Sequence, residues 1–196
     1  MKCSLSTAVA LLLTIAPSVC PAQDSFVKTT AVYKQVGDLK IQADVYRPPT
    51  KDVLPVVVWI HGGALIMGHR EGISGRVRQW AQENGCALVS IDYRLAPETK
   101  LPAIIEDLED SFRWIRGEGA EQFHLDSERV AVTGGSAGGY MTMVAGYRIK
   151  PRVQVLLSFW GYGDLVGEWY SKPSPHPRHN GRRISEQEAW KQIDGT

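Results

Sequence analysis

Residues 129–139 read RVAVTGGSAGG, a β-branched apolar run followed directly by a glycine-rich turn around Ser136. Residues 134–138 fit the pattern G-x-S-x-G, and residues 137–147 have the apolar spacing of a helix. A strand, a sharp turn and a helix in this order place the serine hydroxyl at the C-terminal edge of a sheet. Glycines flank the serine because such a turn brings the backbone too close for side chains. The stretch therefore predicts a nucleophilic serine.

Further apolar runs predict the sheet that carries this turn, at residues 54–60, 86–91, 130–133 and 153–159. A strand that is apolar at nearly every position is buried on both faces, which is typical of a parallel sheet covered by helices. Helical spacing separates these runs, at residues 73–84, 102–115 and 137–147. Two earlier segments, 30–36 and 40–46, read as strands, and the second alternates so that one of its faces should be solvated. The expected fold class is α/β, with a mostly parallel sheet flanked by helices.

Composition excludes several classes of protein. The chain has 196 residues, of which 43% are hydrophobic and 22% charged, as in an ordinary soluble domain. Its formal net charge of +1 gives no indication of binding to nucleic acid or to an anionic membrane. No run reaches the roughly 18 apolar residues of a membrane span. No group of His, Cys, Asp and Glu has metal-ligand spacing, so no metal or cofactor is implied. The oligomeric state stays open.

The N-terminus reads as a secretory signal peptide. Lys2 supplies a positive start, residues 5–15 are apolar, and a small-residue cleavage site precedes a cut after Ala22. We therefore expect a signal peptide at 1–22, an α/β domain at 23–196, and a secreted or periplasmic location.

The three cysteines indicate neither a disulfide framework nor a lipid anchor. Cleavage after Ala22 would remove two of them. A lipid-attachment signal at Cys20 normally has a large aliphatic residue three positions earlier and a small one directly before, where this chain has Pro17 and Val19. Cys86 opens an apolar run and is expected to be a buried core thiol.

A second glycine-rich turn, HGGA at 61–64, follows the 54–60 run directly. Glycines allow backbone N–H groups to point at a ligand, and the N–H of Ala137 beside the serine can join them. Two parts of one mechanism, each at the end of an expected strand, predict an acyl-transfer site with Ser136 as nucleophile.

Residues 61–68 (HGGALIMG), 92–98 (DYRLAPE) and 134–139 (GGSAGG) resemble the hormone-sensitive-lipase-like branch of the α/β-hydrolases. This branch includes bacterial carboxylesterases and relatives of acetyl-xylan and feruloyl esterases. The resemblance covers about residues 30–165. It implies a serine carboxylic-ester hydrolase that works through an acyl-enzyme on a small-molecule or polysaccharide-linked ester.

The resemblance also implies roles for particular residues. Ser136 is the nucleophile, and the oxyanion hole is formed by Gly62, Gly63 and Ala137. The family usually carries a third glycine where this chain has Ala64, a departure that should leave the N–H donors intact. In the family, the histidine at the position of His61 orients the loop and is not the base. A polar network beneath the site is expected from Asp92, Arg94 and Glu98.

The acid and base of a catalytic triad are not found. In this fold they follow the nucleophile in the chain, after further strands, and no buried apolar run occurs after residue 159. Three interpretations stay open. The chain is a truncated member of the family; or it has a rearranged triad with Asp164 as acid and His176 or His179 as base; or it is a non-catalytic binding or interaction protein that kept the turn.

If the last strands are missing, the sheet exposes an edge and apolar surface. We therefore expect this chain, expressed alone, to be marginally stable or to aggregate. Size-exclusion chromatography with light scattering, followed by a thermal melt, checks this. A monodisperse monomer that melts cooperatively would contradict the expectation.

Overall fold

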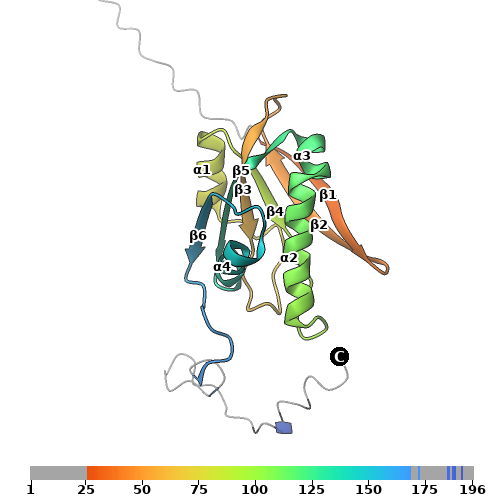
Figure 1. Ribbon diagram of the computed structural model, residues 1–196, viewed down its shortest axis with the longest axis vertical. Coiled ribbons are helices and arrows are strands. Elements are labelled where there is room, and N and C mark those ends of the chain that lie inside the picture. Colours follow the sequence, from red (N-terminus) through yellow and green to blue (C-terminus); the bar gives the residue numbers. More distant parts are fainter. Residues whose placement is uncertain (1–25, 169–171, 173–184, 186, 189–190, 192–196) are drawn as a thin grey trace, which may run out of the picture.

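The computed structural model describes residues 26–168, 172, 185, 187–188 and 191. It contains one sheet of order β1-β2-β4-β3-β5-β6 with helices on both faces (Figure 1). The strands are β1 (Val27–Val36), β2 (Leu39–Arg47), β3 (Leu54–Ile60), β4 (Ala87–Ile91), β5 (Leu125–Gly135) and β6 (Val155–Phe159). The helices are α1 (Gly75–Glu83), α2 (Leu101–Arg116), α3 (Glu118–Phe123) and α4 (Ala137–Arg148). The expected signal peptide at 1–22 and Cys20 lie outside the described residues.

The sheet begins antiparallel and continues parallel, which confirms the predicted fold class. β1 pairs with β2, and β2 with β4, in antiparallel register. β3 then pairs in parallel with β4 and β5, and β5 with β6. The short helix α3 was not expected from the sequence, because six residues are too few to show a helical apolar period. Within the described residues, no helix is long and apolar enough to cross a membrane.

The position of β3 between two helix layers explains why its sequence is apolar at every position. Its alternate residues Val56, Val58 and Ile60 belong to the core beneath α2 and α4. The residues between them, Val57 and Trp59, pack on the opposite face in a second cluster that includes Ala81 of α1 and Cys86. A helix layer on each side therefore buries both faces of the strand, as a continuous apolar run predicts.

The expectation of a solvated face on β2 is wrong. Asp44, which stands at one of the alternate positions expected to be solvated, is fully buried. Its carboxylate accepts hydrogen bonds from the Thr30 hydroxyl at 2.6 Å and from Arg70 Nε at 2.9 Å, and Lys28 Nζ lies 2.9 Å away. The face of β2 that carries Asp44 is covered, because Tyr46 on the same face packs in the cluster that includes Ala81 of α1. The acid is tolerated there because it is paired.

Strand β6 also departs from the sequence interpretation, which expected burial on both faces. Val155, Leu156 and Leu157 are 54%, 44% and 51% exposed. The reason is position, because β6 is the outermost strand of the sheet and pairs only with β5 among the described residues. Burial of a strand depends on its neighbours, and its own sequence does not report them.

The parallel strands end together at one edge of the sheet. Ile60 of β3 is in register with Ile91 of β4 and Gly134 of β5, and Gly135 is in register with Phe159 of β6. The segments that follow these four strands therefore leave the sheet side by side. This edge is where open α/β sheets place their ligand sites.

Two glycines give a matched test of the close packing at this edge. A β-carbon on Gly138 would lie 2.0 Å from the carbonyl oxygen of Ile60, whereas one on Gly75 in α1 would meet no atom within 4 Å. Both glycines lie in helices. We expect Gly138→Ala to lower the free energy of unfolding by about 2–4 kcal/mol. Gly75→Ala should leave it unchanged or raise it by up to about 1 kcal/mol. Chemical denaturation of both variants checks this, and equal effects would refute the packing argument.

Candidate active site

Ser136 occupies the turn between β5 and α4 in a conformation that few residues adopt. Its φ and ψ are 57° and −120°, well outside the helical range. Its N–H donates to the carbonyl of Phe159 at 3.0 Å, and its carbonyl accepts from Tyr140 N–H at 3.0 Å, so the strained turn is fixed on both sides. The residue is partly exposed at the sheet edge. Strain held by the surrounding structure is typical of functional turns, and it delivers the hydroxyl to the helix N-terminus.

The turn that follows β3 touches the serine turn with backbone alone. A β-carbon on Gly62 would lie 2.8 Å from the carbonyl oxygen of Gly135 and 3.4 Å from the β-carbon of Ser136. One on Gly63 would lie 2.0 Å from the carbonyl oxygen of Met67, and Gly63 has φ +117°. Glycine is therefore required at both positions, for space at the first and for space and conformation at the second.

The predicted oxyanion donors are brought to the same place as the serine. Ala137 is fully buried and is the first residue of α4, where a helix leaves its N–H groups without internal partners. Within the described part of the chain, the N–H groups of Gly62, Gly63 and Ala137 donate to no protein acceptor. N–H groups without protein partners are the kind of donor that stabilises the negative oxygen of a tetrahedral intermediate.

Ala64, which stands where the family usually has glycine, adopts a left-handed conformation. Its φ is 55°, and the next residue, Leu65, has φ 64°. Side chains disfavour this region of backbone conformation. The turn nevertheless closes, because the carbonyl of Gly63 accepts hydrogen bonds from the N–H groups of Ile66 and Met67, both at 3.0 Å. The departure therefore places a β-carbon in a strained backbone conformation.

His61 is buried and engaged within the loop itself. It is 2% exposed, and its Nδ1 lies 2.8 Å from the carbonyl oxygen of Gly62. Because a carbonyl oxygen only accepts, Nδ1 carries the proton of this hydrogen bond. Burial lowers the pKa of His61 below its ordinary value near 6.5, so the ring is neutral at neutral pH. The geometry fits the orienting part expected for this histidine.

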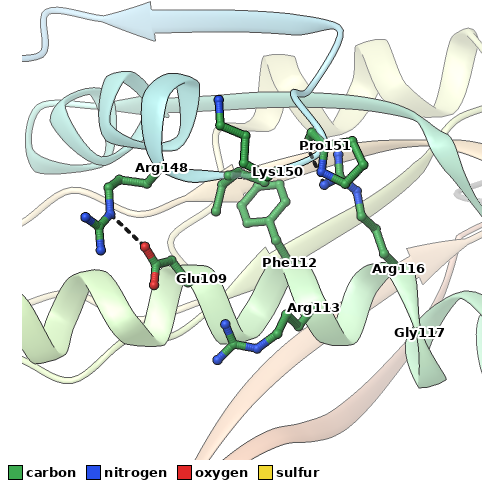
Figure 2. A pocket seen from close by; sticks show the side chains of 9 residues that line it. Glu109, Phe112, Arg113, Arg116, Gly117, Arg148, Lys150 and Pro151 are labelled. Atoms are coloured by element: carbon green, nitrogen blue, oxygen red, sulfur yellow. Dashed lines mark hydrogen bonds and ion pairs between the residues drawn. The ribbon is translucent and has the colours of Figure 1, made fainter.

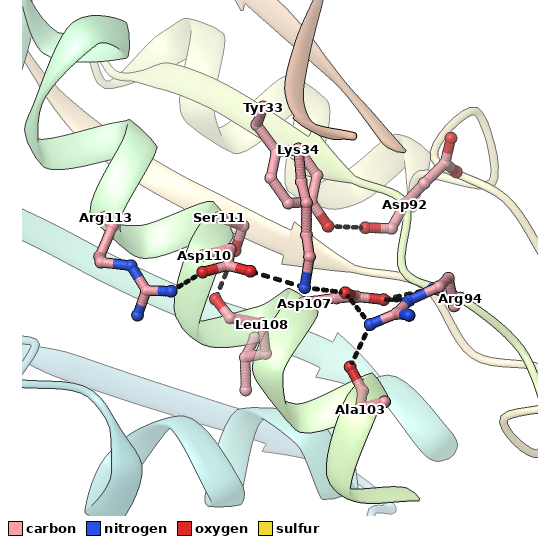
Figure 3. Close-up of polar contacts among 10 residues, drawn as sticks. All are labelled: Tyr33, Lys34, Asp92, Arg94, Ala103, Asp107, Leu108, Asp110, Ser111 and Arg113. Atoms are coloured by element: carbon pink, nitrogen blue, oxygen red, sulfur yellow. Dashed lines mark hydrogen bonds and ion pairs between the residues drawn. The ribbon is translucent and has the colours of Figure 1, made fainter. Parts of the chain in front are cut away.

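Two of the three residues expected in a polar network form ion pairs, each in a separate group. Arg94 binds the buried carboxylate of Asp107 through Nε at 2.7 Å, Nη2 at 2.8 Å and its backbone N–H at 3.0 Å (Figure 3). Asp92 pairs with Arg70, whose Nη1 lies 2.6 Å from the carboxylate. Glu98 is exposed and makes no ion pair within the described residues, so its expected part in the network is wrong.

Asp107 itself was missed from the sequence, although a signal was present. It falls on the buried face of α2, three residues after Ile104 and next to Leu108. A charged residue on the apolar stripe of a helix indicates a buried partner. Its second partner is Lys34 of β1, whose Nζ lies 2.6 Å from the carboxylate. This contact could not be found from the sequence, because Lys34 belongs to a strand 73 positions away.

No general base is found among the described residues. The hydroxyl of Ser136 makes no hydrogen bond to any of them, and the described histidines are His61, His69 and His124. Asp164, the alternative acid, is exposed and accepts hydrogen bonds from the N–H groups of two following residues, as in an ordinary Asx turn. His176 and His179 lie outside the described residues.

A large cavity lies away from Ser136. It has about 630 Å³ and lies between the C-terminal ends of α2 and α4 (Figure 2). Its lining is rich in cations, namely Arg113, Arg116, Arg148 and Lys150. The positions of these cations have a structural explanation, because cations at helix C-termini offset the negative end of the helix dipole. Within the described residues, no three His, Cys, Asp or Glu side chains come together as metal ligands would.

The chain is similar in sequence to known enzymes. The model of the BD-FAE family matches residues 43–166 of this chain. Esterase LipI of Mycobacterium tuberculosis is 41% identical over 109 residues, which are 54% of this chain and 34% of LipI. Carboxylesterase NlhH of the same species is 40% identical over 116 residues, covering 59% of this chain and 35% of NlhH. The chain thus spans about a third of the length of these relatives.

The fold matches solved structures over a similar share. A hyperthermophilic esterase from the archaeon Pyrobaculum calidifontis aligns with a TM-score of 0.61 and 33% identity, over 72% of this chain and 45% of that structure. The α/β architecture and the identity above 30% agree with the family match.

The buried ion pair of Asp107 predicts how stability depends on pH. Burial alone would raise the pKa of Asp107, but hydrogen bonds from Arg94 and Lys34 outweigh it and hold the pKa below the ordinary 3.8. A carboxyl whose pKa is lowered on folding stabilises the fold above its unfolded pKa and loses that contribution as pH falls through the folded value. We expect the free energy of unfolding to decline below about pH 4.

Asp107→Asn should lower the free energy of unfolding at pH 7 by about 2–4 kcal/mol and flatten the decline below pH 4. Asp126→Asn is the control, since Asp126 forms an exposed pair with Arg129 and its loss should cost less than about 1 kcal/mol. Denaturant titrations of both variants between pH 3 and 7 check this. Equal losses would show that burial of the pair is unimportant.

Proposed function

The chain belongs to the BD-FAE family of α/β-hydrolases, related to carboxylesterases, and from this premise we propose that it is a serine carboxylic-ester hydrolase. The observation that carries the proposal is the strained turn of Ser136, at φ 57° and ψ −120°, with the backbone of Gly62 against it. The names of the relatives, an esterase and a carboxylesterase, support the same reaction class.

The proposed reaction has two stages. The Oγ of Ser136 attacks the ester carbonyl carbon and gives its proton to a base, and the carbonyl oxygen becomes negative. The N–H groups of Gly62, Gly63 and Ala137 hold that oxygen. The tetrahedral intermediate collapses, the alcohol leaves with a proton from the base, and an acyl-enzyme remains. Water then attacks the acyl carbon by the same steps in reverse, which releases the acid and restores the serine.

The base in this proposal is a histidine outside the described residues. His61 does not fit the task, because its ring is buried and its Nδ1 is already engaged by Gly62. A serine without an adjacent base is a poor nucleophile near neutral pH. The turnover of this chain therefore depends on a group other than the residues that form the oxyanion hole.

The proposal also covers the substrate class and the cellular location of the protein. We place the substrate among small-molecule or polysaccharide-linked esters, because the reaction centre recognises only the ester group. The apolar segment at residues 5–15, preceded by Lys2, supports a signal peptide at 1–22 and a secreted or periplasmic enzyme.

A fluorophosphonate probe tests the proposal directly, because it forms a covalent adduct only with an activated serine. We expect intact mass to rise by one adduct, mapped by peptide mass to Ser136, and turnover of a short-chain nitrophenyl ester to fall at least about 10³-fold in Ser136→Ala. Ser127→Ala, a change at the other end of the same strand β5, is the matched control and should retain both signals. Absence of adduct and of Ser136-dependent turnover would instead support a non-catalytic binding or interaction protein.

A further inference from the structure

Tyr93 lies directly beneath the loop that would hold the oxyanion. It follows β4 and is 4% exposed. Its hydroxyl donates to the carbonyl oxygen of His61 at 2.9 Å. Its ring stacks on the imidazole of the same residue, with centroids 4.2 Å apart and planes 10° from parallel. One tyrosine therefore contacts both the backbone and the side chain of the residue that precedes Gly62.

The contact with the backbone sets the direction of one donor. A peptide unit is planar and trans, so its C=O and N–H point in opposite directions. The carbonyl of His61 shares a peptide unit with the N–H of Gly62. When the Tyr93 hydroxyl holds that carbonyl, it also fixes the direction of the Gly62 N–H. Burial raises the pKa of Tyr93 well above its ordinary value, so the hydroxyl remains a donor throughout the working range of pH.

The contact with the His61 ring sets the direction of the second donor, the Gly63 N–H, for the same reason. The carbonyl of Gly62 shares a peptide unit with the N–H of Gly63, and this carbonyl is held by Nδ1 of His61 at 2.8 Å. The ring of His61 lies between the ring of Tyr93 and the backbone at Gly68. A β-carbon on Gly68 would lie 2.4 Å from Nδ1 of His61. The ring has no room to turn away from Gly62.

Tyr93 is in turn fixed by its neighbours. Its preceding residue, Asp92, offers a carbonyl that accepts the Tyr33 hydroxyl of β1 at 2.6 Å (Figure 3). Its following residue, Arg94, is bound to Asp107 of α2 through backbone and guanidinium. Both flanks of Tyr93 are thus anchored to separate elements of the fold, which makes it a rigid support.

We propose that Tyr93 is a positioning residue for the oxyanion donors, aligning the Gly62 N–H through the His61 carbonyl and the Gly63 N–H through the His61 ring. The importance of these donors rests on the proposed function, whereas the ordering of the loop by Tyr93 does not. The sequence around Tyr93 does not indicate this role, because its contact with His61 joins residues 32 positions apart.

The test uses Tyr93→Phe, which keeps the ring and removes only the hydroxyl. Tyr46→Phe is the matched control, a buried tyrosine in the other core cluster. In Tyr93→Phe, we expect the amide protons of Ile66 and Met67, which are bonded to the carbonyl of Gly63, to exchange with solvent about threefold to tenfold faster. NMR order parameters of the Gly62 and Gly63 amides should fall from about 0.85 towards 0.6. Exchange in β3 and α4 should stay unchanged.

Loop amides that behave alike in the wild type, Tyr93→Phe and Tyr46→Phe would overturn the proposal. Uniformly faster exchange across the whole chain would also overturn it, since that result means a general stability role. Neither measurement needs turnover, so an inactive Ser136 would refute the proposed function and leave this test intact. Where ester turnover is present, Tyr93→Phe should lower kcat and leave KM nearly unchanged, because the donors act on the transition state.

Discussion

A β-carbon on Gly138 would lie only 2.0 Å from the carbonyl oxygen of Ile60. The C-terminal edge of the sheet depends on this close approach of two backbones. The end of β3 and the start of α4 meet without any side chain between them. Gly134 shares the requirement, since a β-carbon there would lie 2.6 Å from the same oxygen. This closeness puts the backbone of the 61–64 turn within reach of Ser136. A site made from main-chain donors needs such contact, because main-chain groups cannot extend to meet a distant partner.

Buried paired charges tie the loops at this edge to the rest of the fold. Asp44 and Asp107 are both fully buried, and each is held by cations from more than one element. Buried ion pairs add little net stability compared with apolar packing, but breaking one is costly. Their effect here is geometric. They tie the segments after β3 and β4 to β1, β2 and α2, so the loops that reach the site cannot move independently of the sheet.

Local sequence was enough to predict most of the elements. The bounds of β3 are those of its apolar run, because every residue from Val56 to Ile60 packs in one of two core clusters and a glycine turn ends the strand. The turn of Ser136 was equally readable, since strand, glycines and helix are contiguous. The failures concern relations between distant segments. The exposure of β6 depends on its position at the end of the strand order, and the pairing of Tyr93 with His61 joins residues 32 positions apart. The catalytic roles of Ser136 and the oxyanion donors stay predictions, because geometry alone places them together.

The strand order also constrains how the protein is made. β3 is the centre of the sheet, yet its partner β5 leaves the ribosome some seventy residues later. At about 5–20 residues per second, the glycine turn waits roughly 4–15 s before the strand that carries Ser136 exists. During that interval one edge of β3 has no partner, and its apolar faces are open to chaperones or to other chains. A chain that emerges from its N-terminus, whether from a ribosome or from a secretion channel, therefore carries a half-paired β3 until β5 follows.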